Sequence, residues 1–182
     1  MTIRLEVAKT YKLFIGGAFP RSESGRSIPV TGLKGKVLAH ISHASRKDLR
    51  DAVEAARKAQ SKWADATAYN RGQVLYRMAE MLEGKKSEFI GLIGGPRGKR
   101  EVAASIDRLV CFGGWADKYA QVLGCNNPVS GPFYNFTVPE PTGVVGVIAP
   151  DEPSLLGLVS LAFYGVDLVF FYRNRKRRHI EL

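Results

Sequence analysis

The chain has 182 residues, of which 45% are hydrophobic and 24% charged, and it carries a formal net charge of +10. These proportions are typical of a globular protein with room for one domain, and they exclude a collagen, a coiled coil or wholesale disorder. Five of the positive charges lie in the run RNRKRR at residues 173–178. The helical segments elsewhere mix both signs, so no nucleic-acid partner is expected.

The amino-terminal part of the chain contains three short runs with a β-strand pattern. Residues 12–20 and 27–32 are separated by the polar segment RSESGR, which predicts an antiparallel pair. Residues 36–44 alternate apolar and polar side chains and predict another strand. His40 and His43 lie three residues apart on it and face opposite sides, so no metal site is expected there.

Three helices follow in the sequence. The first runs from Ser45 to about residue 63, with apolar side chains at steps of three and four. A second is predicted over 70–93 and a third over 101–123. The segment GGPRGKR at 94–100 is rich in glycine and proline and predicts a solvated loop between them.

Two further strands are predicted, at FYNFTV (133–138) and at GVVGVIA (143–149). The second is apolar throughout, as expected of a parallel strand buried on both faces. Its glycines, Gly143 and Gly146, lie before or inside the strand. They do not form the glycine-rich phosphate cradle that opens a nucleotide-binding helix.

The runs FGGWADK (112–118) and PEPTGVVGVIAP (139–150) resemble sequences of the NAD(P)-dependent aldehyde dehydrogenase superfamily. YKLFIGGAF and two helical segments before them occur in that family's usual order and spacing. The resemblance covers about residues 11–161. It implies an α/β fold with an N-terminal hairpin, helices, an oligomerisation strand and the first strand of a Rossmann-like coenzyme domain.

The resemblance also implies a division into three parts. Residues 1–142 would hold the hairpin, the helices and the oligomerisation strand, 143–161 the start of the coenzyme domain, and 162–182 a divergent basic tail. By position, the coenzyme, NAD or NADP, would contact the residues just after the strand of the coenzyme domain. These are Ile148, Ala149, Pro150, Asp151 and Glu152.

The loop after this strand departs from the family. Where the family has Pro-Trp-Asn-Phe-Pro, residues 150–154 read Pro-Asp-Glu-Pro-Ser. The family's asparagine donates a hydrogen bond to the developing oxyanion, which an ionised Glu152 cannot do. The glutamate base and the cysteine nucleophile, which lie far downstream in the family, are missing from the sequence. We therefore expect very weak coenzyme binding and no oxidation of aldehydes to acids by this chain alone.

Neither cysteine is expected to replace the nucleophile. Cys111 falls within a predicted helix beside apolar neighbours and predicts a small core residue. Cys125 follows a helix C-terminus, where the helix dipole raises a thiol pKa. Two cysteines without metal-ligand spacing, and a start without an apolar signal, favour a cytoplasmic location. No catalytic residue and no metal ligand is assigned.

Two alternatives to an inactive dehydrogenase fragment remain open. An interaction chain would associate with a copy of itself or with a full-length dehydrogenase through the strand at 133–138 and the N-terminal hairpin. A tail-anchored membrane protein would use the apolar residues 155–172 followed by the basic run. Asp167 near the middle of that apolar stretch argues against the anchor.

Overall fold

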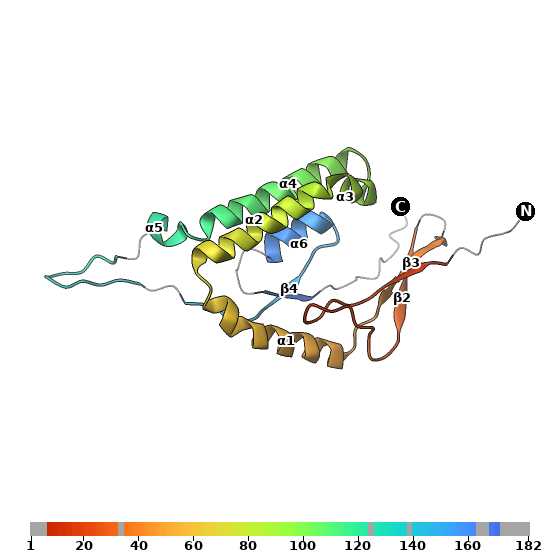
Figure 1. Ribbon diagram of the computed structural model, residues 1–182, viewed down its shortest axis with the longest axis horizontal. Helices are drawn as coiled ribbons and strands as arrows, with labels where there is room; N and C mark the ends of the chain where they lie inside the picture. The colour runs from red at the N-terminus through yellow and green to blue at the C-terminus, as the bar shows by residue number, and fades with distance from the viewer. Residues whose placement is uncertain (1–6, 33–34, 124–125, 138–139, 163–167, 172–182) are drawn as a thin grey trace, which may run out of the picture. The chain divides into compact units, whose positions relative to one another are not determined.

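The computed structural model describes residues 7–32, 35–123, 126–137, 140–162 and 168–171, and it divides into two compact units, Met1–Ala59 and Gln60–Leu182. Figure 1 labels the helices and strands. The expected α/β class is confirmed, since both units combine a small sheet with helical residues.

The first unit contains a three-stranded sheet in the order β1-β3-β2, formed by β1 (Lys9–Tyr11), β2 (Ser27–Thr31) and β3 (Val37–Ser42). β3 is central, parallel to β1 and antiparallel to β2. The prediction of a strand within 36–44 is therefore confirmed.

The expected pairing of 12–20 with 27–32 is wrong. Ile15 and Ala18 exchange both backbone hydrogen bonds, at 3.0 and 3.1 Å, so the run folds back on itself. Gly16 and Gly17 make this turn with φ of 60° and 81°, a region open to glycine at little cost. β2 therefore does not pair with this run and pairs with β3 instead.

Helix α1 (Arg46–Ala64) begins with a reciprocal cap. The hydroxyl of Ser45 accepts from the backbone N–H of Asp48 at 3.2 Å, and the carboxylate of Asp48 accepts from the N–H of Ser45 at 2.7 Å. The two side chains thus satisfy groups that a helix end leaves without partners.

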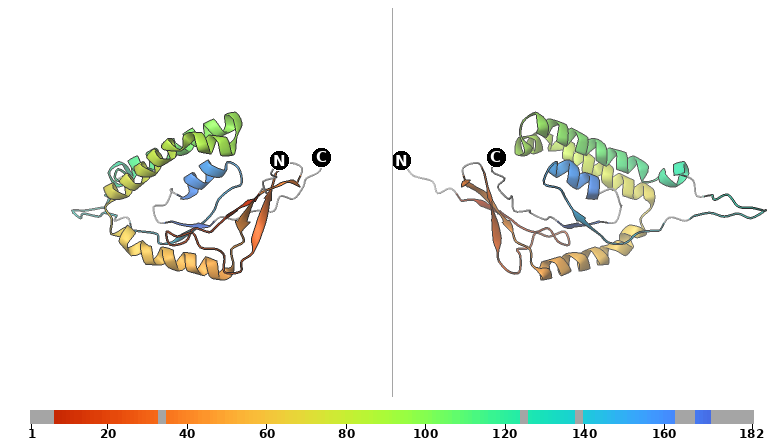
Figure 2. Two further views of the ribbon diagram at one scale, coloured as in Figure 1. Left: turned by 45° about the vertical axis from the view of Figure 1, so that its right-hand side comes forward. Right: turned by 180° about the vertical axis from the view of Figure 1, so that it is seen from behind.

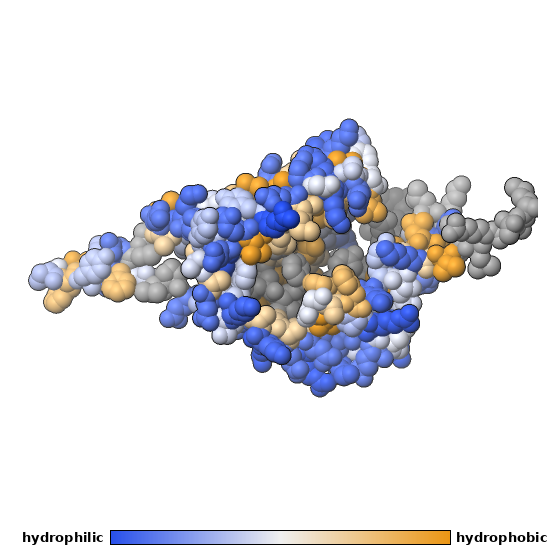
Figure 3. Space-filling view, in the orientation of Figure 1, coloured by the Kyte–Doolittle hydropathy of each residue, from blue (hydrophilic) through white to orange (hydrophobic). Residues whose placement is uncertain are grey.

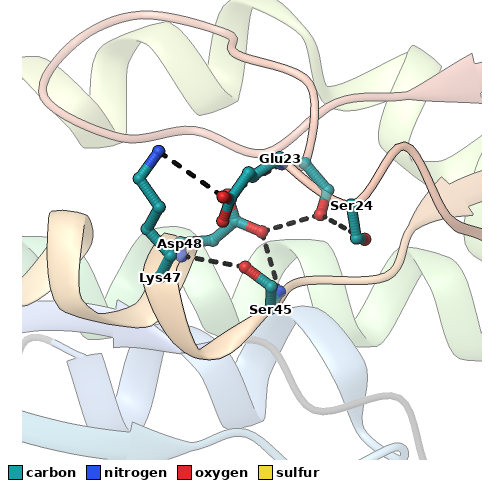
Figure 4. Close-up of polar contacts among 6 residues, drawn as sticks. Glu23, Ser24, Ser45, Lys47 and Asp48 are labelled. Carbon is teal, nitrogen blue, oxygen red and sulfur yellow. Dashed lines mark hydrogen bonds and ion pairs between the residues drawn. The ribbon is translucent and has the colours of Figure 1, made fainter.

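The same carboxylate fixes the loop before β2, as Figure 4 shows. The hydroxyl of Ser22 donates to Asp48 at 2.7 Å, and the N–H of Glu23 donates to it at 3.2 Å. Lys47 adds an exposed ion pair to Glu23 at 3.8 Å. Asp48 is only 6% exposed, so one buried acid ties the helix start to the loop at 22–24.

The second unit contains helices α2 (Ala68–Gly84), α3 (Lys86–Ile93), α4 (Gly95–Trp115), α5 (Tyr119–Leu123) and α6 (Ser154–Ala162). Figures 1 and 2 show α2 and α4 side by side, with α6 against the pair. A Cβ on Gly72 would lie 2.8 Å from the carbonyl oxygen of Gly113, so the two backbones approach closely at this point. Leu75, Ala79, Leu109 and Val159 form a cluster of buried apolar side chains where these helices meet.

Three predictions for the helical region need correction. The expected helix over 101–123 is divided, because α4 ends at Trp115 and α5 begins at Tyr119. The expected helix over 70–93 is divided at Lys85, where α2 ends and α3 begins. The expected loop at 94–100 is wrong, because α4 starts at Gly95. Pro96 stands in the first turn of α4, where a proline costs no hydrogen bond.

The segment 126–137 forms an extended arm in place of the strand expected at 133–138. Its two sides are joined by an isolated bridge between Asn126 and Phe136 and by a hydrogen bond from the N–H of Asn127 to the carbonyl of Asn135 at 2.8 Å. The side chain of Asn127 also donates to Thr137 at 3.1 Å. Residue 138 lies outside the described residues.

Strands β4 (Val145–Ile148) and β5 (Leu168–Phe171) pair in parallel. In the sequence, α6 lies between them. The strand expected at 143–149 is confirmed with shorter bounds. Its partner, β5, comes from the segment 162–182 that was expected to be a divergent tail. Within the described residues, no helix is long and apolar enough to cross a membrane.

Candidate functional site

The candidate site is the loop 149–153, which joins the carboxyl end of β4 to the start of α6. In parallel α/β units, ligands bind at this end of the strands. Ile148 is 66% exposed and Ala149 is 9% exposed, while Pro150, Asp151 and Glu152 are all exposed. The five residues expected to contact the coenzyme therefore lie together along the strand end and this loop.

The loop folds back over the first turn of α6. A Cβ placed on Gly157 would overlap the ring of Pro150, so a glycine is needed at this point of the helix. The N–H of Gly157 donates to the carbonyl of Pro153 at 2.9 Å. Pro150 therefore covers one side of the helix start.

Glu101, a residue of α4, caps the N-terminus of a different helix, α6. Its Oε1 accepts from the backbone N–H of Leu155 at 2.7 Å and from that of Leu156 at 3.4 Å. The residue before the helix is Pro153, whose side chain has no acceptor to offer. Glu101 is 5% exposed, so a buried carboxylate fills the place of an N-terminal cap.

Arg97 lies one turn before Glu101 on α4 and faces two carboxylates. Its Nε is 3.6 Å from Oε2 of Glu101, an oxygen that accepts no hydrogen bond, and its Nη1 is 2.9 Å from Oε2 of Glu152. The side chains of Arg97 and Glu152 are 47% and 60% exposed, so their pair contributes at most about 1 kcal/mol. One guanidinium thus links the helix cap to the loop.

Sequence reasoning missed Glu101 and Arg97. The buried stripe of α4 includes Gly98, Val102, Ser105 and Leu109, and Glu101 falls on it. An acid on an apolar stripe indicates a buried partner. That signal was present in the sequence, but the partner, the start of α6, lies 54 residues farther along.

The prediction that Cys111 is a core residue is wrong. Cys111 is exposed, because it lies on a different face of α4 from the buried Leu109 and Gly113. Ten residues separate it from Glu101, about 15 Å along the helix axis. Cys125 lies outside the described residues. Within the described part of the chain, no group of three or more histidine, cysteine or acidic side chains is placed to hold a metal ion.

A family profile described as "Aldehyde dehydrogenase family" matches residues 20–162. Retinal dehydrogenase 2 of Gallus gallus is 34% identical over 160 residues, which are 82% of this chain and 30% of that protein. The chain therefore spans about a third of the length of the curated relatives that it matches.

Solved structures of similar proteins share the fold. A salicylaldehyde dehydrogenase from Pseudomonas putida G7 superposes with a TM-score of 0.80 at 22% identity, over 90% of this chain and 36% of that one. A structure of PnpE in complex with nicotinamide adenine dinucleotide gives a TM-score of 0.77 at 26% identity. That match covers 89% of this chain and 34% of PnpE.

Proposed function

Because the chain belongs to the aldehyde dehydrogenase family, we propose that it supplies the amino-terminal portion of an NAD(P)-dependent aldehyde dehydrogenase fold. Enzymes of this kind oxidise an aldehyde to a carboxylic acid. The observation that supports the proposal is the parallel unit β4–α6–β5, the arrangement expected at the opening of a coenzyme domain. It follows the helices in the order that the family resemblance implies.

The loop after β4 does not fit a bound dinucleotide well. A coenzyme pyrophosphate is anionic, and the acids Glu101 and Glu152 already stand at the start of α6. We keep Ile148, Ala149, Pro150, Asp151 and Glu152 as proposed neighbours of the coenzyme, and we assign none of them a part in hydride transfer.

Catalysis is not expected from the described residues. Cys111, the cysteine among them, is on an exposed face of α4. At the position of the family's asparagine, Glu152 presents a negative charge held by Arg97 at 2.9 Å. A carboxylate there repels an oxyanion where the reaction needs a hydrogen-bond donor.

The proposal is tested by assaying the purified chain with NAD or NADP and a broad panel of aldehydes. We expect no reduced coenzyme above the blank. A Glu152→Asn variant serves as the matched control and should remain inactive, because restoring the amide brings no thiol to the loop. Turnover by the wild type that disappears in a Cys111→Ser variant would contradict the proposal that the chain alone is inactive.

A second candidate function is association with another copy of the chain or with a full-length dehydrogenase. The observation that favours it is the arm at 126–137, where Phe133, Tyr134 and Phe136 are 73%, 76% and 56% exposed. The rings of Tyr134 and Phe136 lie 5.5 Å apart. Figure 3 shows hydrophobic residues on the surface of this arm among hydrophilic ones. Clustered exposed aromatic residues are typical of protein interfaces.

Replacing Phe133, Tyr134 and Phe136 together by serine should shift the chain toward the monomer. Each ring removed takes away apolar area that association would bury, so the dissociation constant should rise by at least about tenfold. Sedimentation velocity over a concentration series measures the change. A Tyr69→Ser variant, which loses a ring 61% exposed on α2, should associate like the wild type. Equal association of the triple variant and the wild type would exclude the arm as the interface.

A further inference from the structure

We propose that Glu101 is a built-in anion at the start of α6, and that it excludes phosphate groups from this helix terminus. The inference rests on the proposed function, in which β4, the loop and α6 open a coenzyme domain. In many such domains the first helix binds a pyrophosphate through its free N–H groups and the positive end of its dipole. In this chain the carboxylate of Glu101, on α4, occupies the position at the start of α6 that the pyrophosphate would take.

The contacts of Glu101 are those that a phosphate oxygen would make. Its Oε1 lies 2.7 Å from the nitrogen of Leu155 and 3.4 Å from that of Leu156. Its side chain is 3% exposed, and its main-chain carbonyl accepts from the hydroxyl of Ser105 at 2.7 Å. Glu101 is therefore anchored in the buried face of α4, and a competing anion would have to displace a charge with little access to water.

The surroundings strengthen the exclusion. Arg97, a cation beside the helix start, is already paired with Glu101 and with Glu152. Glu152 adds a second negative charge on the loop side, and the ring of Pro150 packs over Gly157. A phosphate approaching α6 would therefore meet two carboxylates and no uncommitted N–H group at Leu155 or Leu156. A dinucleotide held by a protein that contains this chain must place its pyrophosphate at other residues.

The test is a titration of the ¹⁵N-labelled full chain with inorganic pyrophosphate, following the amide resonances of Leu155 and Leu156. Neither resonance should move in the wild type at millimolar pyrophosphate. In Glu101→Ala both should move, with an affinity at least about tenfold higher than any wild-type response. Glu101→Gln keeps the size and an acceptor oxygen but loses the charge, and it should show a smaller gain. If circular dichroism shows that the alanine variant does not fold, the test compares only Glu101→Gln with the wild type.

Glu88→Ala, which removes an exposed acid from α3, is the control for net charge and should behave like the wild type. The proposal is overturned if wild-type Leu155 and Leu156 respond to pyrophosphate as strongly as the variants do. It is equally overturned if the folded variants stay as unresponsive as the wild type. These outcomes are independent of aldehyde turnover, so failure here is distinguishable from failure of the proposed function.

Discussion

Leu109→Ala should lower the free energy of unfolding of the chain by about 2–5 kcal/mol, the range for a buried leucine cut back to alanine. Leu109 is 2% exposed and lies in the cluster with Leu75, Ala79 and Val159, which come from α2 and α6. Its loss leaves a cavity where α4 meets both helices. Glu101, on the same helix as Leu109, caps the start of α6. The packing of α4 on α6 therefore also positions the loop 149–153.

Urea unfolding followed by circular dichroism measures the effect. Val110→Ala is the matched control, since Val110 is the next residue on α4 and is 44% exposed. It should change the free energy of unfolding by no more than about 0.5 kcal/mol. Equal losses in the two variants would mean that α4 does not bury the face carrying Leu109.

The stability of the first unit should fall in acid because of Asp48. Burial by itself would raise the pKa of this carboxyl, but hydrogen bonds to its charged form outweigh burial and lower the pKa from 3.8 to about 2. The donors are the N–H groups of Ser45 and Glu23 and the hydroxyl of Ser22. The ionised form is therefore favoured in the folded state.

The direction of the pH effect follows from the lowered pKa. The folded state binds the proton less tightly than the unfolded chain, so the stabilisation is present above about pH 4 and is lost as the pH falls toward 2. The difference between the two pKa values corresponds to about 2 kcal/mol. Asp48→Asn should therefore destabilise the chain by about that amount at pH 7 and by much less at pH 2.

Urea titrations of both proteins at several pH values measure this difference. Glu54→Gln is the control on the same helix, because its exposed pair with Arg50, at 3.9 Å, contributes little. A loss in Asp48→Asn that is as large at pH 2 as at pH 7 would show that the charge of Asp48 is not the cause.

Sequence patterns predicted those elements that are determined by neighbouring residues alone. The alternation in 36–44 predicted β3, the serine at position 45 predicted the start of α1, and the apolar run at 143–149 predicted β4. The opening turns of α4 were mispredicted because Gly94, Gly95 and Pro96 suggest a break. A proline in the first helical turn is compatible with the helix, and that position could be recognised only once the helix start was known.

The pairings between distant segments could not be predicted. β3 lies between β1 and β2 and pairs with both. β4 pairs with residues 168–171, which belong to a segment expected to be a divergent tail. At the candidate site, the choice of Ile148 to Glu152 as neighbours of the coenzyme rests on the family resemblance and stays a prediction. The charges that control this loop come from Arg97 and Glu101, which no pattern near the loop reveals.

Calorimetric titration of the chain with NAD and with NADP tests most directly the claim that this chain presents the opening unit of a coenzyme domain without a working coenzyme site. A complete site combines several strand ends with a free helix N-terminus. Here the described residues offer the ends of two parallel strands, β4 and β5, and the start of α6 is occupied by Glu101. The account predicts dissociation constants weaker than about 10 μM for both coenzymes, and a constant at or below about 10 μM for either would contradict it.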